Sequence, residues 1–317
     1  MNATPTDASA AEQVAAGPKR GLSLRRYRII VWVAFASLFV IIVTGSLVRL
    51  TGSGLGCIDW PACNEEQFVD ISTPHAAIEQ LNRLFTGVVA ASVVAAVLAA
   101  LSVRPRQRRL VRLALWLVAG VLAQVVLGGI VVLTGLHPLS NMGHFLLSVA
   151  LMAGAYLLVD AVSAAGQTDS ANSQTSRGGS LLVGSRVIVV LTLAAIVTGT
   201  VVTGTGPHAG DETAPRFDYM ITSVVRVHGI AVWLVILTAL WFGWQLWRKK
   251  VDQRVQRGFE WFLFAAIAQA GLGYLQYFTG VPITLVAFHV ALSIVVWLAA
   301  LRLATLARRY GGCDTMA

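Results

Sequence analysis

The sequence predicts an all-α integral membrane protein whose eight transmembrane helices form two parallel four-helix repeats. Of its 317 residues, 56% are hydrophobic and 12% are charged, and the mean hydropathy is +0.71. A soluble domain of this length cannot bury so much apolar surface. Apolar runs of the roughly 20 residues needed to cross a bilayer recur along the chain. The predicted spans are 29–50, 76–103, 111–134, 142–163, 185–206, 220–246, 259–279 and 283–305.

An internal repeat divides these spans into two halves. Residues 123–144, AQVVLGGIVVLTGLHPLSNMGH, resemble residues 268–289, AQAGLGYLQYFTGVPITLVAFH. The first and fifth spans share VTGSLVRLTGSG and VTGTVVTGTG. Each half crosses the membrane an even number of times, so both halves run in the same direction. The predicted segments are a disordered tail (1–28), a first half (29–163), a linker (164–184), a second half (185–305) and a second tail (306–317).

The basic residues predict the orientation. Twenty of the 24 Lys and Arg residues lie at the termini and in every second loop, on one side of the bundle. The positive-inside rule therefore places both termini in the cytoplasm and the chain in the plasma membrane. The formal charge of +9 is then an orientation signal, and no nucleic-acid partner is expected. The first span has no cleavage site after it and is expected to be retained.

Polar residues gather where the second span begins, in HAAIEQLNR. His75, Glu79 and Asn82 follow i, i+4, i+7 spacing and share one helix face, with Arg83 beside them. An ionisable residue inside a span is a functional candidate by default, and a carboxyl group near the membrane surface suits proton transfer. Arg83 can pair with Glu79 or with a carboxylate of a bound group. A buried structural ion pair is the alternative.

Three histidines occupy related positions in the repeat. His144 matches His289, and His228 matches Asn82. His228 and His289 enter their spans from the outer face by similar numbers of residues, so their imidazoles are expected at similar depth. Two facing imidazoles in an apolar cleft edged by Gly273 favour bis-histidine haem ligation. Zinc is disfavoured because neither position offers a cysteine or carboxylate.

The two halves are therefore expected to differ in role. The second half, with paired histidines, is predicted to hold a fixed cofactor. The first half, with Asn82 in place of a histidine and with Glu79 one turn away, is predicted to be a reaction site. His137 and His208 lie in outer loops and are interpreted as surface histidines.

Two of the three cysteines lie in the first outer loop, in GCIDWPAC. The outer compartment permits disulfides, and the five residues around a proline turn make a bridge between Cys57 and Cys63 easy. The pair can be interpreted as a disulfide that stabilises the loop or as a redox-active pair, and both interpretations are open. Cys313, in the predicted cytoplasmic tail, is expected to be a free thiol.

Several of these segments together resemble the haem A synthase family. They are TGSGLGCIDWPAC, the Glu79-to-Arg83 stretch, GHFLLS around His144, TGTGPHAGD and the histidines of spans six and eight. The resemblance extends from about residue 29 to 305. It implies an eight-helix membrane oxidoreductase acting on a CH group. Such an enzyme oxidises the C8 methyl of haem O to the formyl group of haem A, which terminal oxidases use.

The resemblance also implies roles for individual residues. Haem b would lie between His228 and His289, and haem O would have His144 as axial ligand and Glu79 as the essential acid/base. Cys57 and Cys63 resemble the outer-loop pair thought to assist haem transfer or redox chemistry. The implied partners are a haem O synthase, a terminal oxidase under assembly and an electron carrier of unknown identity.

The sequence departs from the family pattern in two places. The family commonly has histidine where this chain has Asn82, which removes the second ligand expected for the substrate iron. His75, two turns nearer the surface on the same face, is the candidate substitute; otherwise the iron is five-coordinate or holds water. The outer loop 207–219 also lacks the cysteine pair that some members carry there.

Two other functions fit an eight-helix repeat. A non-enzymatic two-haem electron-transfer protein of the cytochrome b type predicts symmetric ligand pairs, and the asymmetry at Asn82 and Glu79 argues against it. A transporter usually shows broken helices near mid-membrane, whereas the polar residues here gather near the outer face.

Overall fold

The computed structural model describes residues 21–166, 179–249 and 251–310, and within them the regular elements are eight α-helices. This confirms the predicted fold class. Cys313, most of the predicted tail 1–28 and the middle of the predicted linker lie outside the described residues. The helices are α1 (Leu24–Leu50), α2 (Pro74–Ser102), α3 (Arg108–Leu133), α4 (Pro138–Ala165), α5 (Ser180–Thr205), α6 (Ile221–Arg248), α7 (Gln253–Phe278) and α8 (Ile283–Tyr310).

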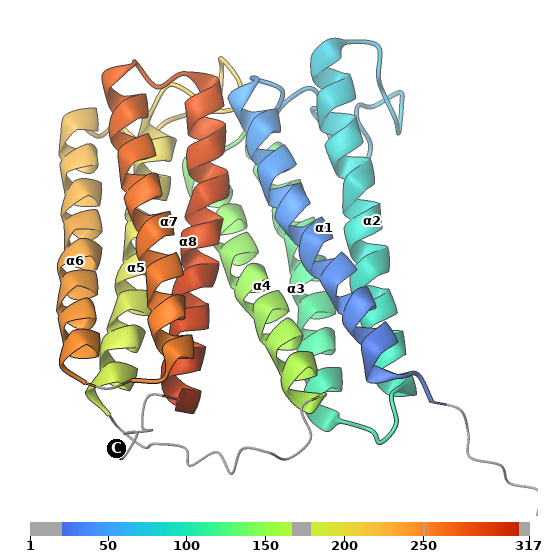
Figure 1. The fold of residues 1–317 in the computed structure, drawn as a ribbon. Helices are drawn as coiled ribbons and strands as arrows, with labels where there is room; N and C mark the ends of the chain where they lie inside the picture. The colour runs from blue at the N-terminus through green and yellow to red at the C-terminus, as the bar shows by residue number, and fades with distance from the viewer. Residues whose placement is uncertain (1–20, 167–178, 250, 311–317) are drawn as a thin grey trace, which may run out of the picture.

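Seven of these helices are long and apolar enough to cross a membrane, so the chain is a multi-pass membrane protein. The exception is α7, which is as long as the others but carries Gln256, Glu260, Gln269 and Gln276. These side chains lower its hydropathy without shortening it. In Figure 1 α7 runs beside α8, within the same bundle as the other helices.

The helices alternate in direction, and the start of α1 and the end of α8 lie at the same end of the bundle (Figure 1). The two halves use the same set of neighbours. Helix α1 packs against α2 and α4 as α5 packs against α6 and α8, and α3 pairs with α4 as α7 pairs with α8. The seam between the halves is formed by α1, α4, α5 and α8. These shared neighbours support the predicted repeat.

Each half has its own apolar core. Tyr27 and Met152 are fully buried in the core of the first half, and Phe242 and Phe262 in that of the second. Many large apolar side chains point outward instead, as expected for helices that face lipid. The first core extends across the seam to Ile196 of α5 and to Ile294 and Trp297 of α8. The indole N–H of Trp297 also donates to a backbone carbonyl of α4 at 3.1 Å.

Polar contacts fasten the seam at both ends. At the end of the bundle opposite the start of α1 and the end of α8, named the outer end here after its predicted orientation, the Arg49 guanidinium donates to the carbonyl of His208 at 2.9 Å and to that of Thr203 at 3.0 Å. At the opposite end, Arg309 of α8 pairs with Asp160 of α4 at 2.6 Å. The position of each half is therefore fixed relative to the other by side chains as well as by core packing.

The turns that end α3 and α7 share an unusual backbone. Leu136 and Val281, which are equivalent in the repeat, have φ of 60° and 54°. Residues other than glycine rarely adopt this left-handed backbone conformation. The repeat thus extends to backbone conformation. Nε2 of His208 lies 2.8 Å from the carbonyl oxygen of Val281. His208 therefore holds the α5–α6 loop to this turn and is not a free surface histidine.

Candidate active site

Four repeat-related side chains lie at one level near the outer ends of the even-numbered helices. They are Asn82 in α2, His144 in α4, His228 in α6 and His289 in α8. Each lies six to eight residues past the first residue of its helix. At roughly 1.5 Å per residue this is about 9–12 Å below the helix start.

Thr198 of α5 lies within hydrogen-bond distance of the His228 ring. The Thr198 hydroxyl oxygen lies 3.1 Å from Nδ1 of His228 and 3.0 Å from each of the carbonyl oxygens of Ala194 and Ala195. A hydroxyl that donates its one proton to either carbonyl accepts a hydrogen bond from Nδ1–H. This leaves the Nε2 lone pair of His228 available to a metal.

His144 and His289 have similar surroundings, except that the Gln269 amide nitrogen also lies 3.1 Å from Nε2 of His289. A glutamine on the preceding helix donates to the backbone carbonyl of each, Gln124 to His144 and Gln269 to His289, both at 3.1 Å. Nδ1 of both rings is buried and has no hydrogen-bond partner among the described residues. Buried ring nitrogens without a partner are rare in folded proteins, so both imidazoles fit a role in which a ring nitrogen binds a ligand.

A glycine faces each of the three imidazoles. A Cβ built on Gly128 would lie 3.4 Å from Cε1 of His144, one on Gly199 3.2 Å from that of His228, and one on Gly273 3.1 Å from that of His289. Any larger side chain would press on the ring. Among the described residues no three His, Cys, Asp or Glu side chains gather as a metal site would need. Imidazoles that lie beside glycines are donors that suit a haem, which supplies its own equatorial ligands.

Asn82 occupies in the first half the place that His228 occupies in the second. Its Oδ1 lies 2.8 Å from the hydroxyl of Thr44, and a Cβ on Gly45 would lie 3.9 Å from its Nδ2. Thr44 and Gly45 match Thr198 and Gly199 in the repeated VTG segment. The threonine and the glycine are thus the same in both halves, and the side chain that they face differs, Asn82 on α2 and His228 on α6.

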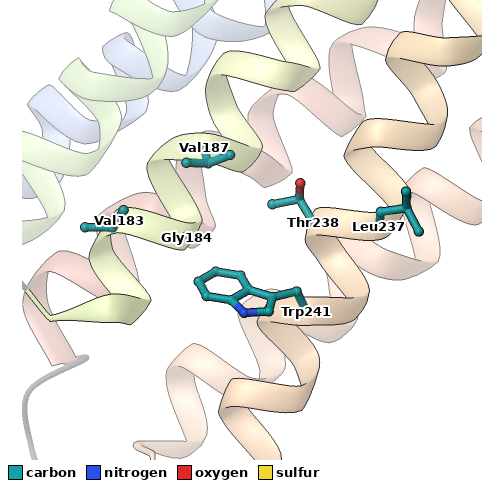
Figure 2. Close-up of a pocket in the computed structure, with 6 residues that line it drawn as sticks. All are labelled: Val183, Gly184, Val187, Leu237, Thr238 and Trp241. Carbon is teal, nitrogen blue, oxygen red and sulfur yellow. The ribbon is translucent and has the colours of Figure 1, made fainter.

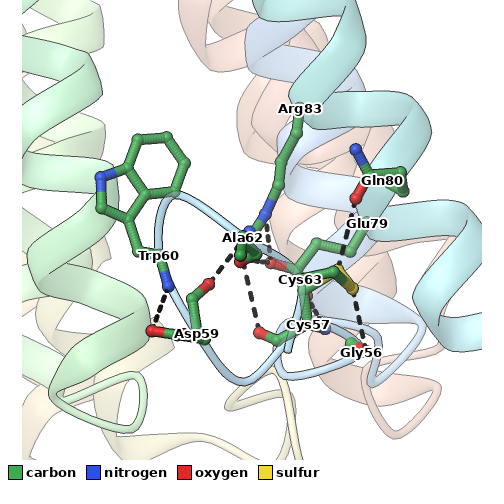
Figure 3. Close-up of polar contacts among 9 residues, drawn as sticks. All are labelled: Gly56, Cys57, Asp59, Trp60, Ala62, Cys63, Glu79, Gln80 and Arg83. Atoms are coloured by element: carbon green, nitrogen blue, oxygen red, sulfur yellow. Dashed lines mark hydrogen bonds and ion pairs between the residues drawn. A yellow bond between two sulfur atoms is a disulfide. The ribbon is translucent and has the colours of Figure 1, made fainter. Parts of the chain in front are cut away.

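Glu79, which lies one turn before Asn82, forms an ion pair with Arg83, the residue after Asn82 (Figure 3). Arg83 donates to Oε1 of Glu79 from Nη2 at 2.6 Å and from Nε at 3.0 Å. Oε2 accepts the backbone N–H of Cys57 at 2.7 Å. Arg83 also donates through Nη1 to the carbonyls of Asp59 and Ala62, each at 3.1 Å. Glu79, with 5% of its surface exposed, is thus held in place by both a helix neighbour and the outer loop.

The loop that supplies these contacts is closed by a disulfide between Cys57 and Cys63, both buried, with their Cα atoms 4.3 Å apart. Its Trp60 ring lies beside Arg83, 5.3 Å from the guanidinium carbon. On the other side Trp60 packs on α3, where a Cβ on Gly129 would come within 2.5 Å of the ring. The loop therefore covers the outer end of the first half, between α2 and α3 (Figure 3).

His75 lies apart from the other predicted site residues. It is exposed at the start of α2, and its Nδ1 is 2.9 Å from the hydroxyl of Ser53. Seven residues separate it from Asn82, about 10 Å along the helix axis. Asp211 of the α5–α6 loop is near it, and hydrogen bonds from the Thr213 side chain and backbone lower the pKa of the Asp211 carboxyl group. His75 thus belongs to the outer loop region.

An apolar cavity of about 320 Å³ lies elsewhere, between α5 and α6 (Figure 2). It lies near the start of α5 and the end of α6, far along both helices from His228. Its lining residues are Val183, Gly184, Val187, Leu237, Thr238 and Trp241. None of them is titratable, so this cavity offers apolar contact but no chemistry.

The sequence pattern of a known family matches nearly the whole chain: COX15-CtaA, described as cytochrome oxidase assembly protein, aligns with residues 28–301. The chain belongs to this family. Among curated relatives, heme A synthase of Listeria welshimeri is 26% identical over 265 residues, covering 79% of this chain and 85% of the relative. Heme A synthase of Bacillus pumilus is 34% identical over 123 residues, covering 38% and 40%.

Heme A synthase of Listeria monocytogenes is also 26% identical, over 267 residues, with coverage of 79% and 85%. The resemblance seen in the sequence motifs is thereby confirmed at the level of the family. Three side chains that contact the candidate site residues were not predicted from the sequence. They are Thr44, Thr198 and Trp60. The two threonines had a signal, because both stand in the repeated VTG segment. Trp60 had none beyond its place between the cysteines.

Proposed function

We propose that this protein is a haem A synthase, an oxidoreductase that converts the C8 methyl group of haem O into the formyl group of haem A. Family membership and the relatives named above support the general activity. One structural observation carries the assignment of the reaction to the first half. The Glu79–Arg83 pair lies beside Asn82, whereas the equivalent positions beside His228 hold Val225 and Gly229.

In this proposal the second half holds a resident haem b. His228 and His289 would be its ligands, since each presents a ring beside a glycine and His228 has a lone pair directed by Thr198. When bound, this group supplies one-electron transfer. The protein contributes fixed ring orientations and an apolar surround, the two factors through which proteins tune haem.

The first half would bind haem O as substrate, with His144 as the protein ligand of its iron. Glu79 would manage protons, or stabilise positive charge, at the methyl carbon. In each of two successive oxidations a hydroxyl group from water would replace a hydrogen of this carbon, with two protons leaving by way of Glu79 and two electrons passing to the electron carrier. The resulting hydrate loses water to give the formyl group. The Arg83 guanidinium and the Cys57 N–H hold both oxygens of Glu79 in place. The disulfide-closed loop would keep water away from this carboxylate.

The proposal extends to location and partners. The basic loops and both termini would face the cytoplasm, so that the haem sites lie near the outer face of the plasma membrane. Haem O would arrive from a haem O synthase, haem A would leave toward a terminal oxidase under assembly, and an electron carrier would serve the second half. Residues 29–163 would act as the substrate half and 185–305 as the haem b half.

Replacement of Glu79 by Gln tests the catalytic assignment. Membranes containing Glu79→Gln should retain haem b and haem O but form haem A at least about 100-fold more slowly, the usual size of an acid/base contribution. Extraction and mass analysis of the bound haems measures this. Glu66 is an exposed glutamate of the loop between α1 and α2. Glu66→Gln is therefore the matched control and should behave as wild type.

Undiminished haem A formation by Glu79→Gln would remove the catalytic role of this residue. If the purified wild-type protein carried haem b alone, with no haem O or haem A under any supply, the proposed reaction itself would be wrong. A cytochrome b-type electron carrier would then be the better description.

A further inference from the structure

The two repeat-equivalent threonines make opposite use of their hydroxyl groups. In the second half the Thr198 hydroxyl can donate to a backbone carbonyl at 3.0 Å and then accepts a hydrogen bond from Nδ1–H of His228. In the first half the Thr44 hydroxyl lies 2.8 Å from Oδ1 of Asn82 but 3.3 Å from the carbonyl of Ile41. The shorter contact takes the proton, so Thr44 donates to Asn82.

This bond determines what Asn82 presents. Its Oδ1 is engaged by Thr44, and its Nδ2 lies on the side of Gly45, whose counterpart Gly199 faces the ring of His228. An amide NH₂ group donates two hydrogen bonds and has no lone pair free for a metal. Where the second half presents an imidazole lone pair, the first half therefore presents N–H donors on a shorter side chain.

No other group of α2 takes over as a ligand. Both carboxylate oxygens of Glu79 are engaged, one by Arg83 and the other by the Cys57 N–H. His75 is exposed, hydrogen-bonded to Ser53 and about 10 Å from Asn82 along the helix.

We propose that haem O is held by a single protein ligand, His144, and that Asn82 faces the opposite side of the iron as a hydrogen-bond donor. This rests on the proposed function of the first half. The coordination position beside Asn82 is then open to a small neutral ligand with a lone pair, such as water or a diatomic gas. The halves divide the work: one has both positions filled by histidine and exchanges electrons only, and the other admits a small molecule beside the methyl group.

Carbon monoxide binding to the full-length protein, purified with its haems from cells that make haem O, tests this. After reduction, haem O and haem A should bind carbon monoxide and haem b should not. In Asn82→His the imidazole should fill the open position, and carbon monoxide binding by haem O and haem A should fall about tenfold or more. The ferric high-spin electron paramagnetic resonance signal of the wild type should disappear with it.

Two further variants address the donor itself. Asn82→Ala should still bind carbon monoxide, but the C–O stretching frequency should rise because the N–H donor is gone. Thr44→Val, which frees the amide to rotate, should shift the same frequency while leaving binding intact. The bis-histidine spectrum of haem b reports in every variant whether the protein is folded.

The outcomes separate the two proposals. A wild-type protein with no haem O or haem A at all contradicts the proposed function. A wild-type protein that carries haem O in a low-spin form inert to carbon monoxide leaves that function standing and overturns the single-ligand proposal. An unchanged C–O frequency in Asn82→Ala excludes Asn82 as the donor.

Discussion

The outer ends of α2 and α6 show how two related halves come to differ. Both helices face a threonine and a glycine from the repeated VTG segment, and both lie at the same depth. Between these two helices, the changes at the site lie on one face. The differing pairs are Glu79 and Val225, Asn82 and His228, and Arg83 and Gly229. A repeated scaffold with a changed polar face would be sufficient to turn the proposed symmetric haem site into an asymmetric one.

The outer loops differ as much as the helices beneath them. The loop between α1 and α2 is closed by the Cys57–Cys63 disulfide and contributes carbonyls to Arg83. The loop between α5 and α6 has no cysteine and is fastened instead by Arg49 and by His208. The first loop contacts the Glu79–Arg83 ion pair and so helps to fix the position of these charges.

The largest effect is expected from the histidines. His228→Ala or His289→Ala should lower haem b content at least about tenfold, since each removes an iron ligand, while haem O remains bound. His144→Ala should do the reverse. Haem extraction with mass analysis measures both pigments in one sample, and His137→Ala, an exposed loop histidine, is the control. Equal loss of both pigments in every variant would show that the halves are not independent sites.

The Glu79–Arg83 pair should give the next largest effect. Arg83→Gln leaves a buried carboxylate without its partner and should destabilise the protein by about 3–5 kcal/mol. Thermal unfolding in detergent measures this. Removing both charges in Glu79→Gln/Arg83→Gln should restore part of the loss, because no unpaired charge remains.

The control for this pair is Arg309→Gln, at the opposite end of the bundle. Its ion pair with Asp160 is more exposed, with side-chain exposures of 26% and 11% against 13% and 7% for Arg83 and Glu79. A smaller destabilisation is therefore expected. If Arg83→Gln were as stable as wild type, the pair would be an incidental surface contact rather than the feature that sets the first half apart.

Much of the fold could be predicted from the sequence because apolar length and repetition are local signals. The eight helices and their division into halves followed from these signals alone. The helix ends did not. Helix α1 begins at Leu24, within the stretch assigned to the tail, because Ser23 caps it and Tyr27 is fully buried. The arginines around Tyr27 hide this in a hydropathy profile. Helix α5 likewise begins at Ser180, inside the predicted linker.

The site divides in the same way. The repeat located His144, His228 and His289 because equivalent residues of a repeat occupy equivalent places. The hydrogen bonds between Arg83 and the first outer loop could not be predicted from the sequence, because they depend on where the backbone carbonyls of Asp59 and Ala62 point. Residue type carries no information about that direction. Long-range backbone contacts of this kind appear only once the loop is folded.

The smallest expected effect concerns the glycines that face the imidazoles. A Cβ would come within 3.1 Å of the ring at Gly273 but only within 3.9 Å of the Asn82 amide at Gly45. Gly273→Ala should therefore weaken haem b binding by about 1 kcal/mol, roughly fivefold, whereas Gly45→Ala should leave haem O binding unchanged. Haem titration of each variant measures both. Gly271→Ala, whose Cβ meets nothing within 4 Å, controls for helix propensity. A loss at Gly45 equal to that at Gly273 would mean that the first half is packed around its ligand as tightly as the second, against an open position beside Asn82.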